Sequence, residues 1–352
     1  MYLDRLSLSH FRNYEYQQVT FDKTLNIIHG DNAQGKTNLL EAIHLLTTLQ
    51  PFKTSNYREL ILWNQPQAII EGAFVNENIG KRYSLCLDHQ RKRPGINGKQ
   101  IWKPEDYLGQ TYSICFLPQD LYLLQGTPRQ RRRYLDKVIY GFYPHYGAVL
   151  SRYYKALLQR NAALQMGKDD LIALWGEQLC ENGAKIHLNR LLFIEKLNTL
   201  TSCLYRKISG SDDQEMVLKY ETEIDLDMNL EKENLSSIVV FLLQTKLKKR
   251  EADEKRLRRS LVGPHRDDIA VHIGKRDLRH FGSQGEQRTA VLSIKLAELS
   301  LFESEMDKKP IFLLDDITSE LDHHRMKYLF SVLREKKRQI FVTTTNPSLF
   351  LN

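Results

Sequence analysis

The chain has 352 residues, of which 41% are hydrophobic, so it is long and apolar enough to form the cores of two domains or of one domain with a large insertion. Lys and Arg total 51 against 43 Asp and Glu, which gives a net charge of +8. This balance favours a polyanionic partner such as nucleic acid, although a mildly basic enzyme without such a partner has the same composition.

The cysteines and the apolar segments exclude several classes of protein. Cys86, Cys115, Cys180 and Cys203 are far apart and form no CxxC pair, which is typical of reduced thiols in a cytosolic protein and leaves no zinc pattern. The first residues, MYLDRLSLSHF, lack the long apolar region of a signal peptide. No apolar run approaches the length of a membrane-spanning helix. We therefore expect a cytoplasmic protein with no membrane partner.

A phosphate-binding loop is predicted near the N-terminus. The segment GDNAQGKT matches the pattern G-x-x-x-x-G-K-S/T at Gly30, Gly35, Lys36 and Thr37. An apolar run, LNIIHG, precedes it as a buried strand would, and TNLLEAIHLL follows with the spacing of a helix. In such a loop, backbone N–H groups cradle phosphate oxygens, the lysine reaches the β- and γ-phosphates, and the threonine hydroxyl binds Mg²⁺. The alternative is a chance glycine turn before a core helix, and the strand–loop–helix order argues against it.

The middle of the chain changes from strands to helices. Up to about Pro118 the pattern is mostly β, and INGKQI contains Asn97-Gly98, a hairpin signal. From Gln125 to about Ser209 the pattern is helical, and the apolar residues from Trp175 to Leu204 predict one long amphipathic helix or two in sequence. MVLKYETEI alternates like a strand, and SSIVVFLLQTKLKKREADEKRLRRS predicts another long helix. We expect these helices to form an arm, although an ordinary helical subdomain fits the same pattern.

A second glycine-rich turn precedes a helix at HFGSQGEQRTAVLSIKLAELSLF. A helix start of this kind can bind an anion. The turn is similar to the signature of ABC ATPases, written LSGGQ or LSGGE, with Ser283, Gly285 and Glu286 at matching positions. Gly282 and Gln284 depart from that signature.

A metal-binding carboxylate is predicted at KKPIFLLDDITSELD. Ile311 to Leu314 is an apolar strand that ends at Asp315, the layout of a Walker B motif, in which this aspartate holds Mg²⁺ through its water shell. Asp316 would point to the other face of the strand and could polarise an attacking water. Two such aspartates are, on their own, more typical of a loop start or a helix cap. Together with the phosphate loop they favour a nucleotide site.

The wide separation of the two motifs predicts a split nucleotide domain. We expect residues 1–120 to form the N-terminal half of the head, residues 121–245 an inserted helical lobe, and residues 246–352 the C-terminal half of the head.

With these motifs in this order, the chain resembles the ABC-type ATPase heads of the SMC class and, among them, the RecF family of bacterial recombination mediators. The resemblance covers nearly the whole chain. It rests on LSHFRNYE, GDNAQGKTNLLEAI, FKTSNYRELI, FLPQDLYLLQGTPRQRRRYLD, GPHRDD, GSQGEQR and LLDDITSELD. It implies an α/β fold, an ABC/SMC-type P-loop ATPase head of mixed β-sheets around helices, with an inserted, mostly α-helical lobe.

The resemblance also implies the site residues. ATP would be bound by Gly30, Asp31, Asn32, Ala33, Gln34, Gly35, Lys36, Thr37, Asn38, Gln119, Ser283, Gly285 and Glu286. Mg²⁺ would be held by Thr37, Asp315 and Gln119, and hydrolysis would depend on Asp316 and Lys36. The segment SELD, residues 319–322, matches the D-loop, which crosses the subunit interface in this class.

Three departures from the family pattern affect hydrolysis and metal binding. Asp316 stands where most ABC ATPases have glutamate, and FVTTTNPS lacks the usual switch histidine, for which Thr344 or Thr345 would stand in, or nothing. The RecF pattern commonly has glutamate where Gln119 stands. The shorter acid and the missing histidine imply slow hydrolysis.

The activity that the resemblance implies is an ATP-operated switch. Two heads would dimerise head to tail, with ATP between the P-loop of one copy and Ser283 of the other, and hydrolysis would release them. The protein would be a weak, DNA-stimulated ATPase of recombinational repair and replication restart. It would recognise duplex beside single-stranded gaps, help to load RecA recombinase, and have RecR and RecO as partners.

Two basic runs are candidate contacts to DNA phosphates, which give affinity without sequence reading. The first contains Arg129, Arg131, Arg132 and Arg133. The second contains Lys246, Lys248, Lys249, Arg250, Lys255, Arg256, Arg258 and Arg259, and acidic residues interrupt it. For each run the alternative is a solvated charged helix face. No helix-turn-helix or zinc finger is present, so base-specific reading is not expected.

Three other functions fit parts of the sequence. An ABC transporter ATPase subunit would need a much shorter helical insert and a groove for a membrane partner. A kinase of small metabolites would have no signature, so GSQGEQR argues against it. A nuclease-bearing SMC relative would need a further cluster of metal-binding carboxylates, which the sequence does not contain.

Overall fold

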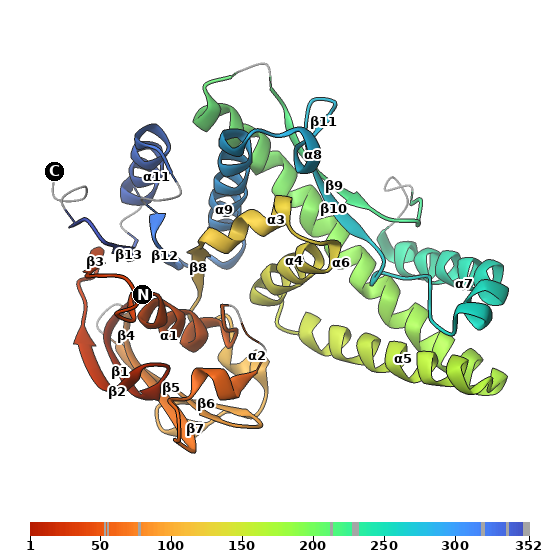
Figure 1. The fold of residues 1–352 in the computed structure, drawn as a ribbon, viewed down its shortest axis with the longest axis horizontal. Helices are drawn as coiled ribbons and strands as arrows, with labels where there is room; N and C mark the ends of the chain where they lie inside the picture. The colour runs from red at the N-terminus through yellow and green to blue at the C-terminus, as the bar shows by residue number, and fades with distance from the viewer. Residues whose placement is uncertain are drawn as a thin grey trace. The chain divides into compact units, whose positions relative to one another are not determined.

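The computed structural model describes residues 1–52, 54, 56–76, 79–211, 214–226, 232–317, 321–335 and 338–347. The chain folds into two compact units, each with its own core (Figure 1). The first unit contains residues 1–121, 203–213 and 284–352, and the second contains residues 122–202 and 214–283. The boundary expected at residue 245 falls inside helix α7 (Lys232–Leu257) of the second unit.

An antiparallel sheet of six strands forms one part of the first unit. Its strands, in spatial order, are β2 (Tyr14–Thr20), β1 (Tyr2–Phe11), β4 (Gln67–Asn76), β5 (Ile79–Asp88), β6 (Lys92–Ile96) and β7 (Lys99–Gln100). Tyr83, Leu85 and Leu87 are buried at alternate positions of β5, as expected for a sheet with one face on a core. The predicted hairpin is confirmed, because Asn97 and Gly98 connect β6 to β7 with φ of 50° and 80°.

A parallel sheet of four strands forms the other part of the first unit. Its strands, in spatial order, are β3 (Leu25–His29), β13 (Ile340–Thr344), β12 (Ile311–Leu314) and β8 (Ser113–Phe116). The two inner strands, β13 and β12, are buried along their whole length, which is typical of parallel strands covered on both faces. Because parallel strands end at the same edge, the segments after β3, β12 and β13 meet there. This topology brings the two ends of the chain to one site.

Helix α1 (Lys36–Thr48) lies between the two sheets (Figure 1). It packs against β1, β4 and β5 of the antiparallel sheet and against β8 and β13 of the parallel sheet. Because α1 is covered by both sheets, its buried residues are not confined to the one apolar face that the sequence predicts. They include the polar residues Glu41 and Thr47. The other helical segments of this unit are η1 (Tyr57–Leu60), α2 (Pro104–Tyr107), η2 (Pro118–Leu121), α9 (Gln284–Met306) and α11 (His323–Glu335).

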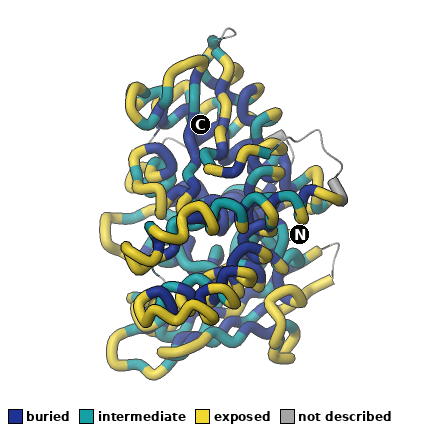
Figure 2. Tube along the Cα trace, turned by 90° about the vertical axis from the view of Figure 1, so that its right-hand side faces the viewer, coloured by how far each residue is buried: buried dark blue, intermediate teal, exposed yellow. Residues whose placement is uncertain are grey.

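The second unit is mostly helical. Its described helices are α3 (Tyr122–Gln125), α4 (Pro128–Phe142), α5 (Tyr146–Met166), α6 (Asp169–Ser209), α7 and α8 (Leu278–Phe281). The last residues of α6, 203–209, belong to the first unit. The structure decides between the two sequence alternatives for α6, because it is a single helix of 41 residues. A small antiparallel sheet accompanies the helices, in the order β11 (Arg276–Asp277), β10 (Asp268–Ile273) and β9 (Met216–Glu221). Along α5 buried positions recur every three or four residues, as at Tyr153, Ala156 and Arg160. Figure 2 colours the chain by burial and shows buried and exposed positions alternating along its helical turns.

Buried charges join the elements of the second unit. The Arg190 guanidinium on α6 donates to both carboxylate oxygens of Asp136 on α4 at 2.9 Å and to the Pro264 carbonyl oxygen at 2.7 Å. Arg160 on α5 pairs with Glu254 on α7 at 2.7 Å. Each guanidinium donates hydrogen bonds to at least two neighbours, and these contacts offset part of the cost of burying its charge.

Candidate functional site

The loop between β3 and α1 has the backbone of a phosphate cradle. Gly30 has φ of 151° and Gly35 has φ of 95°, which residues with a side chain rarely adopt. At Gly35 a Cβ atom would also lie 2.7 Å from the Asn13 Nδ2 atom. Gly35 is the N-cap of α1, and as a glycine it has no side chain that could cap the first N–H groups of the helix. The first N–H groups of α1 are therefore suited to bind an anion.

Lys36 lies over this loop. Its Nζ atom donates to the carbonyl oxygens of Gly30 and Asp31, each at 2.7 Å. An ammonium has three N–H groups, so Lys36 can donate to a phosphate oxygen in the cradle without losing both loop contacts.

The Walker B aspartate meets the P-loop threonine. The Thr37 Oγ1 atom lies 2.9 and 3.1 Å from the two carboxylate oxygens of Asp315, although 278 residues separate them. Thr343, at the end of β13, donates through its Oγ1 atom to the same carboxylate at 2.8 Å. Asp315 is buried, so these two hydroxyls hold its carboxylate at the edge of the sheet. Thr343 is not predicted from the sequence, because the strand pattern alone carries no signal for it.

These groups line a cavity of about 190 Å³. Its walls are Asn32, Ala33, Gln34, Gly35, Lys36, Thr37, Asn38, Asp315, Asp316, Thr343 and Thr345. Amide N–H groups, an ammonium, a hydroxyl and a carboxylate are the groups that a nucleotide phosphate chain with Mg²⁺ requires. Within the described residues no three His, Cys, Asp or Glu side chains cluster as metal ligands. Thr37 and Asp315 therefore fit Mg²⁺ that takes its other ligands from phosphate and water, as this ion usually does.

Asp316 does not continue the strand, which corrects the expectation that it points to the other strand face. Strand β12 ends at Leu314, and Asp316 has a left-handed backbone with φ of 48°. Its backbone N–H donates to the Thr343 Oγ1 atom at 2.9 Å, and the exposed side chain lines the cavity. A carboxylate in this position can reach a water in the cavity.

The two candidates for the switch position have different environments. Thr345 lines the cavity. Thr344 is buried, and its Oγ1 atom donates to the Asn346 carbonyl oxygen at 3.1 Å. Of the two, Thr345 is the residue that the structure places at the nucleotide cavity.

Gln119 lies in η2, after the carboxyl end of β8, and does not line this cavity. Its neighbour Asp120 accepts the Leu117 N–H at 2.8 Å and lies 3.4 Å from the Lys295 Nζ atom on α9. Glu298 also pairs with Lys295, and burial together with nearby Asp120 raises the pKa of Glu298 well above its usual value. These contacts attach the turn that contains Gln119 to the signature helix α9.

The signature turn is held by an arginine that the sequence analysis did not identify. Helix α9 begins at Gln284, directly after Ser283, and Gly285 and Glu286 form its first turn. Arg325 on α11 donates to the Gly285 carbonyl oxygen at 3.1 Å and to the Thr289 Oγ1 atom at 2.7 Å.

Arg325 also pairs with Asp322, the last residue of the expected D-loop. Asp322 accepts the Arg325 backbone N–H at 2.9 Å, so it caps α11. Of the other D-loop residues, Ser319 and Glu320 lie outside the described residues. Arg325 therefore joins the described end of the D-loop to the start of the signature helix within one chain.

Residues at the turn between β1 and β2 also form hydrogen bonds to the P-loop and to the start of α1. The Tyr14 hydroxyl donates to the Gly35 carbonyl oxygen at 3.1 Å, and Asn38 donates to Asn13 at 2.8 Å. Both partners come from the segment LSHFRNYE, which the sequence analysis used for the family resemblance without assigning these contacts.

Comparisons with known proteins agree on one family. The family model described as RecF/RecN/SMC N terminal domain matches residues 2–352. DNA replication and repair protein RecF of Geobacter sulfurreducens is 36% identical over 348 residues, which cover 99% of this chain and 94% of that protein. The protein of the same name from Geobacillus kaustophilus is 39% identical, with 98% and 93% covered. The chain belongs to the RecF family.

Solved structures agree with this assignment. Two structures of the recombination mediator protein RecF in the RecFOR pathway, described as RecF-ATPrS and RecF-ATP, align with TM-scores of 0.90 and 0.87 at 32% identity. They cover 99% and 98% of this chain and 93% and 92% of theirs. An SMC head bound to the C-winged helix domain of ScpA aligns with a TM-score of 0.55 at 17% identity over 99% of this chain and 91% of that one, which shows the shared fold. The chain is therefore an SMC/RecF-type ATPase head of a DNA replication and repair family, and not a transporter subunit.

The first basic run of this RecF-family chain is only partly available for DNA, which corrects the expectation for Arg131. The Arg131 side chain is buried in an ion pair with Asp268 at 2.5 Å and donates to the Gly126 carbonyl oxygen at 2.7 Å. Arg132 is half-buried and donates to the Asp267 carbonyl oxygen at 2.5 Å. Arg129 and Arg133 are exposed.

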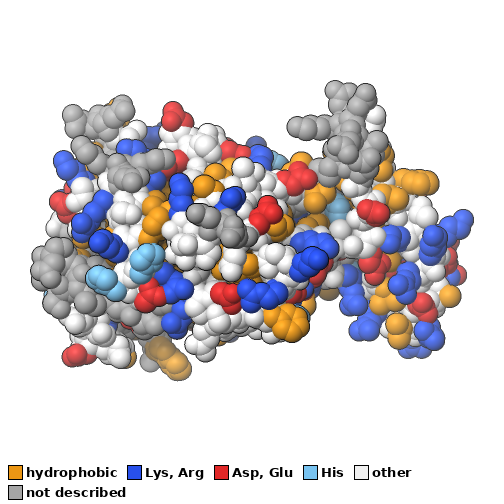
Figure 3. All heavy atoms as spheres, turned by 90° about the horizontal axis from the view of Figure 1, so that it is seen from above, with side chains coloured by type: hydrophobic (Ala, Val, Ile, Leu, Met, Phe, Trp, Pro, Cys, Tyr) orange, Lys and Arg blue, Asp and Glu red, His pale blue; other side chains and the backbone are white. Residues whose placement is uncertain are grey.

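The second basic run lies at the C-terminal end of α7 and just after it. Lys248, Lys249, Arg258 and Arg259 are exposed there. Others of the run are paired, such as Lys255, whose Nζ atom lies 2.8 Å from Asp169 and 2.9 Å from Glu251. On the face drawn in Figure 3, basic side chains are interspersed with acidic ones. In the part of the chain that the structure describes, no helix is long and apolar enough to cross a membrane.

Proposed function

We propose that this chain is an ATP-operated DNA-binding mediator of recombinational repair and replication restart. ATP binding would drive two copies together on DNA where duplex meets a single-stranded gap, and the dimer would help to load RecA recombinase. The observation that carries the proposal is the approach of Thr37 to Asp315 at 2.9 and 3.1 Å, because it unites a hydroxyl and a carboxylate suited to Mg²⁺ beside a glycine cradle.

The need for a second copy follows from what the cavity lacks. Gly285 and Glu286 lie in the same unit as the P-loop, yet neither lines the nucleotide cavity of its own chain. The signature turn of another copy would complete the site over the γ-phosphate. ATP would then favour the dimer because it binds that state more tightly than the monomer.

Hydrolysis would reverse the association. Bound Mg²⁺ would neutralise charge on the phosphates. Thr37 and Asp315 would hold this ion, Lys36 would bind the β- and γ-phosphates, and Asp316 would orient the attacking water. The short Asp316 side chain and a threonine at the switch position support slow turnover, which DNA would stimulate.

DNA contact is proposed for Arg129 and Arg133, since both are exposed. Partners of the RecR and RecO type are part of the proposal, because the solved RecF structures are described as belonging to the RecFOR pathway. A cytoplasmic location is also part of it, because the bacterial chromosome lies there.

Sedimentation with and without ATP, repeated with gapped duplex, tests this proposal. The wild type should dimerise with ATP, and Lys36→Met should stay monomeric because the phosphates lose their counter-charge. Asp316→Asn should bind ATP, hydrolyse it at least about tenfold more slowly and accumulate as dimer.

Two controls accompany these variants. Lys99→Met changes an exposed lysine on β7, and Asp307→Asn changes an exposed aspartate with a similar left-handed backbone, φ of 49°. A wild type that remains monomeric with ATP and DNA, or a Lys36→Met variant that dimerises normally, would refute the proposal.

A further inference from the structure

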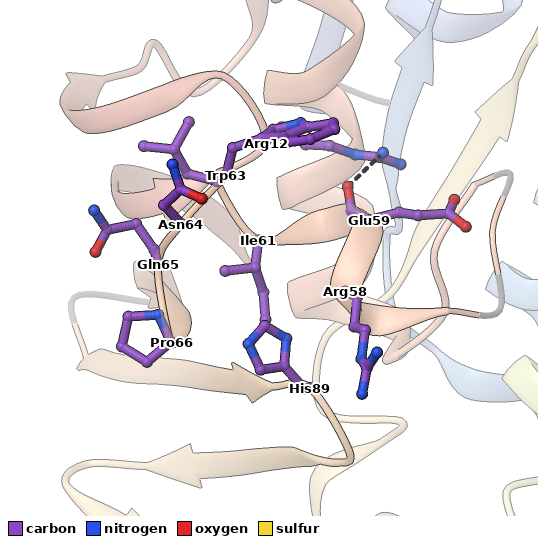
Figure 4. A pocket seen from close by; sticks show the side chains of 10 residues that line it. Arg12, Arg58, Glu59, Ile61, Trp63, Asn64, Gln65, Pro66 and His89 are labelled. Atoms are coloured by element: carbon purple, nitrogen blue, oxygen red, sulfur yellow. Dashed lines mark hydrogen bonds between the residues drawn. The ribbon is translucent and has the colours of Figure 1, made fainter.

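A pocket of about 730 Å³ opens on the surface of the first unit, away from the nucleotide cavity (Figure 4). Its volume lies within the range of small-ligand sites. Residues that define its chemistry are Arg58, Ile61, Trp63, Asn64, Gln65 and His89. None of them lines the nucleotide cavity, and the proposed ATP switch uses none of them.

Trp63 is held exposed by a rigid turn. Its side chain is 89% exposed, the highest value among the exposed large hydrophobic residues of the described chain. The preceding segment is fixed to the end of β1, because the Arg12 N–H donates to the Leu60 carbonyl oxygen and the Leu62 N–H donates to the His10 carbonyl oxygen, both at 2.8 Å.

The turn itself is closed by one more hydrogen bond. The Gln65 N–H donates to the Leu62 carbonyl oxygen at 3.1 Å, and Asn64 has φ of 63°, as the third residue of a type II turn requires. The backbone hydrogen bonds therefore fix the position of the Trp63 Cα atom, from which the indole extends into solvent. Tryptophan is enriched at binding interfaces, because its large ring buries much apolar surface there.

The residues around Trp63 give the pocket an apolar floor with polar side chains beside it. Ile61, which is 4% exposed, lies between the Trp63 side and His89 in Figure 4. Asn64 and Gln65 lie on one side of Ile61 and Arg58 lies on the other, with the His89 ring below Ile61 in Figure 4. An aromatic face, carboxamides and a cation are the groups that hold a nucleobase and its phosphate.

The charge of this pocket favours an anionic occupant. The exposed Arg58 side chain makes no hydrogen bond or ion pair with any residue that the structure describes. Arg12, in contrast, is already bonded to Glu41 at 2.9 Å and to the Glu59 carbonyl oxygen at 2.7 Å. Glu59 is the one acidic residue of the lining, and its carboxylate extends away from Trp63 and His89 (Figure 4). Arg58 is therefore free to pair with a phosphate.

We propose that this pocket binds an unpaired nucleotide of single-stranded DNA, with the base stacked on Trp63 and its phosphate near Arg58. Paired bases are already stacked on each other inside a duplex, so an indole at this position selects for an unpaired strand. The inference rests on the proposed DNA-binding function and adds to it a place on the head that would hold the single-stranded side of a gap.

The test compares Trp63→Ala with Trp102→Ala, which changes a second tryptophan of the same unit that is 80% exposed and does not line the pocket. Binding of a single-stranded 12-mer and of a duplex of the same length is measured by fluorescence anisotropy. Trp63→Ala should weaken single-strand binding by about 5- to 150-fold, since base stacking on an aromatic residue contributes about 1–3 kcal/mol. Its duplex binding and its ATP-dependent dimerisation should stay within about twofold of wild type, and Trp102→Ala should change none of these.

Trp63→Phe provides a second measurement, because phenylalanine keeps an aromatic face and should retain most of the single-strand affinity. Equal single-strand binding by wild type and Trp63→Ala, or an equal loss on single strand and duplex, would overturn this inference while leaving the proposed ATP switch intact. A wild type that binds neither DNA form would instead refute the proposed function itself. Retained DNA binding in Trp63→Ala with loss of a protein partner would assign the pocket to a peptide and likewise overturn the inference.

Discussion

Neighbouring arginines on α4 have opposite environments. Arg129 and Arg133 are four residues apart and share one exposed helix face, whereas Arg131 points to the other side of the helix. There it meets Asp268 on β10, which also pairs with Arg279 at 3.0 Å. Hydrogen bonds to the Arg131 side chain and coulombic attraction to both arginines hold the pKa of the Asp268 carboxyl below its usual range despite its partial burial. Of these three arginines, Arg131 therefore stabilises the fold, whereas Arg129 and Arg133 lie on the surface.

This difference predicts two separable phenotypes. Arg131→Ala should lower the free energy of unfolding by about 3 kcal/mol, because it breaks a buried ion pair, and Arg279 should keep the loss from being larger. The double variant Arg129→Ala with Arg133→Ala should leave stability within about 0.5 kcal/mol of wild type. It should reduce the slope of log K against log salt for DNA binding by up to about 1.8, because each phosphate contact contributes about 0.9. Urea unfolding and salt titration measure the two effects, and a destabilised double variant would contradict the assignment.

Two helices meet at the start of the signature turn. Arg325 on α11 contacts the Gly285 carbonyl oxygen, the Thr289 hydroxyl and Asp322, so its planar guanidinium bridges the end of the D-loop and the first turn of α9. Lysine cannot make these divergent contacts, because an ammonium on a flexible stem lacks the fork geometry. The position of the signature turn thus depends on the shape of one side chain as well as on its charge.

Arg325→Lys tests the role of this bridge. We expect the variant to bind ATP as a monomer with unchanged affinity, because Arg325 does not line the nucleotide cavity. ATP-dependent dimerisation should weaken about tenfold, since the signature turn is less well ordered for a second copy. Isothermal titration gives the first quantity and sedimentation the second, with Arg334→Lys, exposed at the end of the same helix, as the control. Equal loss in both measurements would indicate a general folding defect.

Local patterns in the sequence predict individual helices, strands and turns, but they do not predict which of these elements contact each other. The P-loop helix, the β12 strand and the Asn97-Gly98 hairpin follow from short patterns of apolar and glycine residues. Arg131 was predicted as a DNA contact because nothing in its own segment indicates a partner 137 residues away. The contact of Thr343 with Asp315 depends in the same way on which strands are neighbours in the parallel sheet.

At the scale of the whole chain, one half-buried histidine, His265, makes stability depend on pH. His265 lies in the segment GPHRDD, which the sequence analysis used only for the family resemblance. The Tyr153 hydroxyl lies 2.6 Å from the His265 Nδ1 atom, and the Nε2 atom lies 3.3 Å from the Ser260 carbonyl oxygen. The Ser260 carbonyl oxygen can only accept, so Nε2 carries a proton, and in the neutral ring Nδ1 then accepts from the Tyr153 hydroxyl. Burial, with the nearby positive charge of Arg266, lowers the pKa of His265 to about 4.

The sign of the resulting pH dependence follows from this lowered pKa. In the unfolded chain His265 takes up a proton near its usual pKa of 6.5, whereas the folded chain resists protonation down to about pH 4. Its contribution is fully present above pH 6.5 and is lost progressively as the pH falls to about 4, a change of about 3 kcal/mol. Urea unfolding between pH 7.5 and 4.5 should show a shallower acid decline for His265→Gln than for wild type, because the amide keeps the donor and acceptor without titrating. His280→Gln, an exposed histidine of the same unit, should leave the decline unchanged. An identical decline in wild type and His265→Gln would mean that the pKa of His265 is the same in the folded and the unfolded chain, which contradicts this prediction.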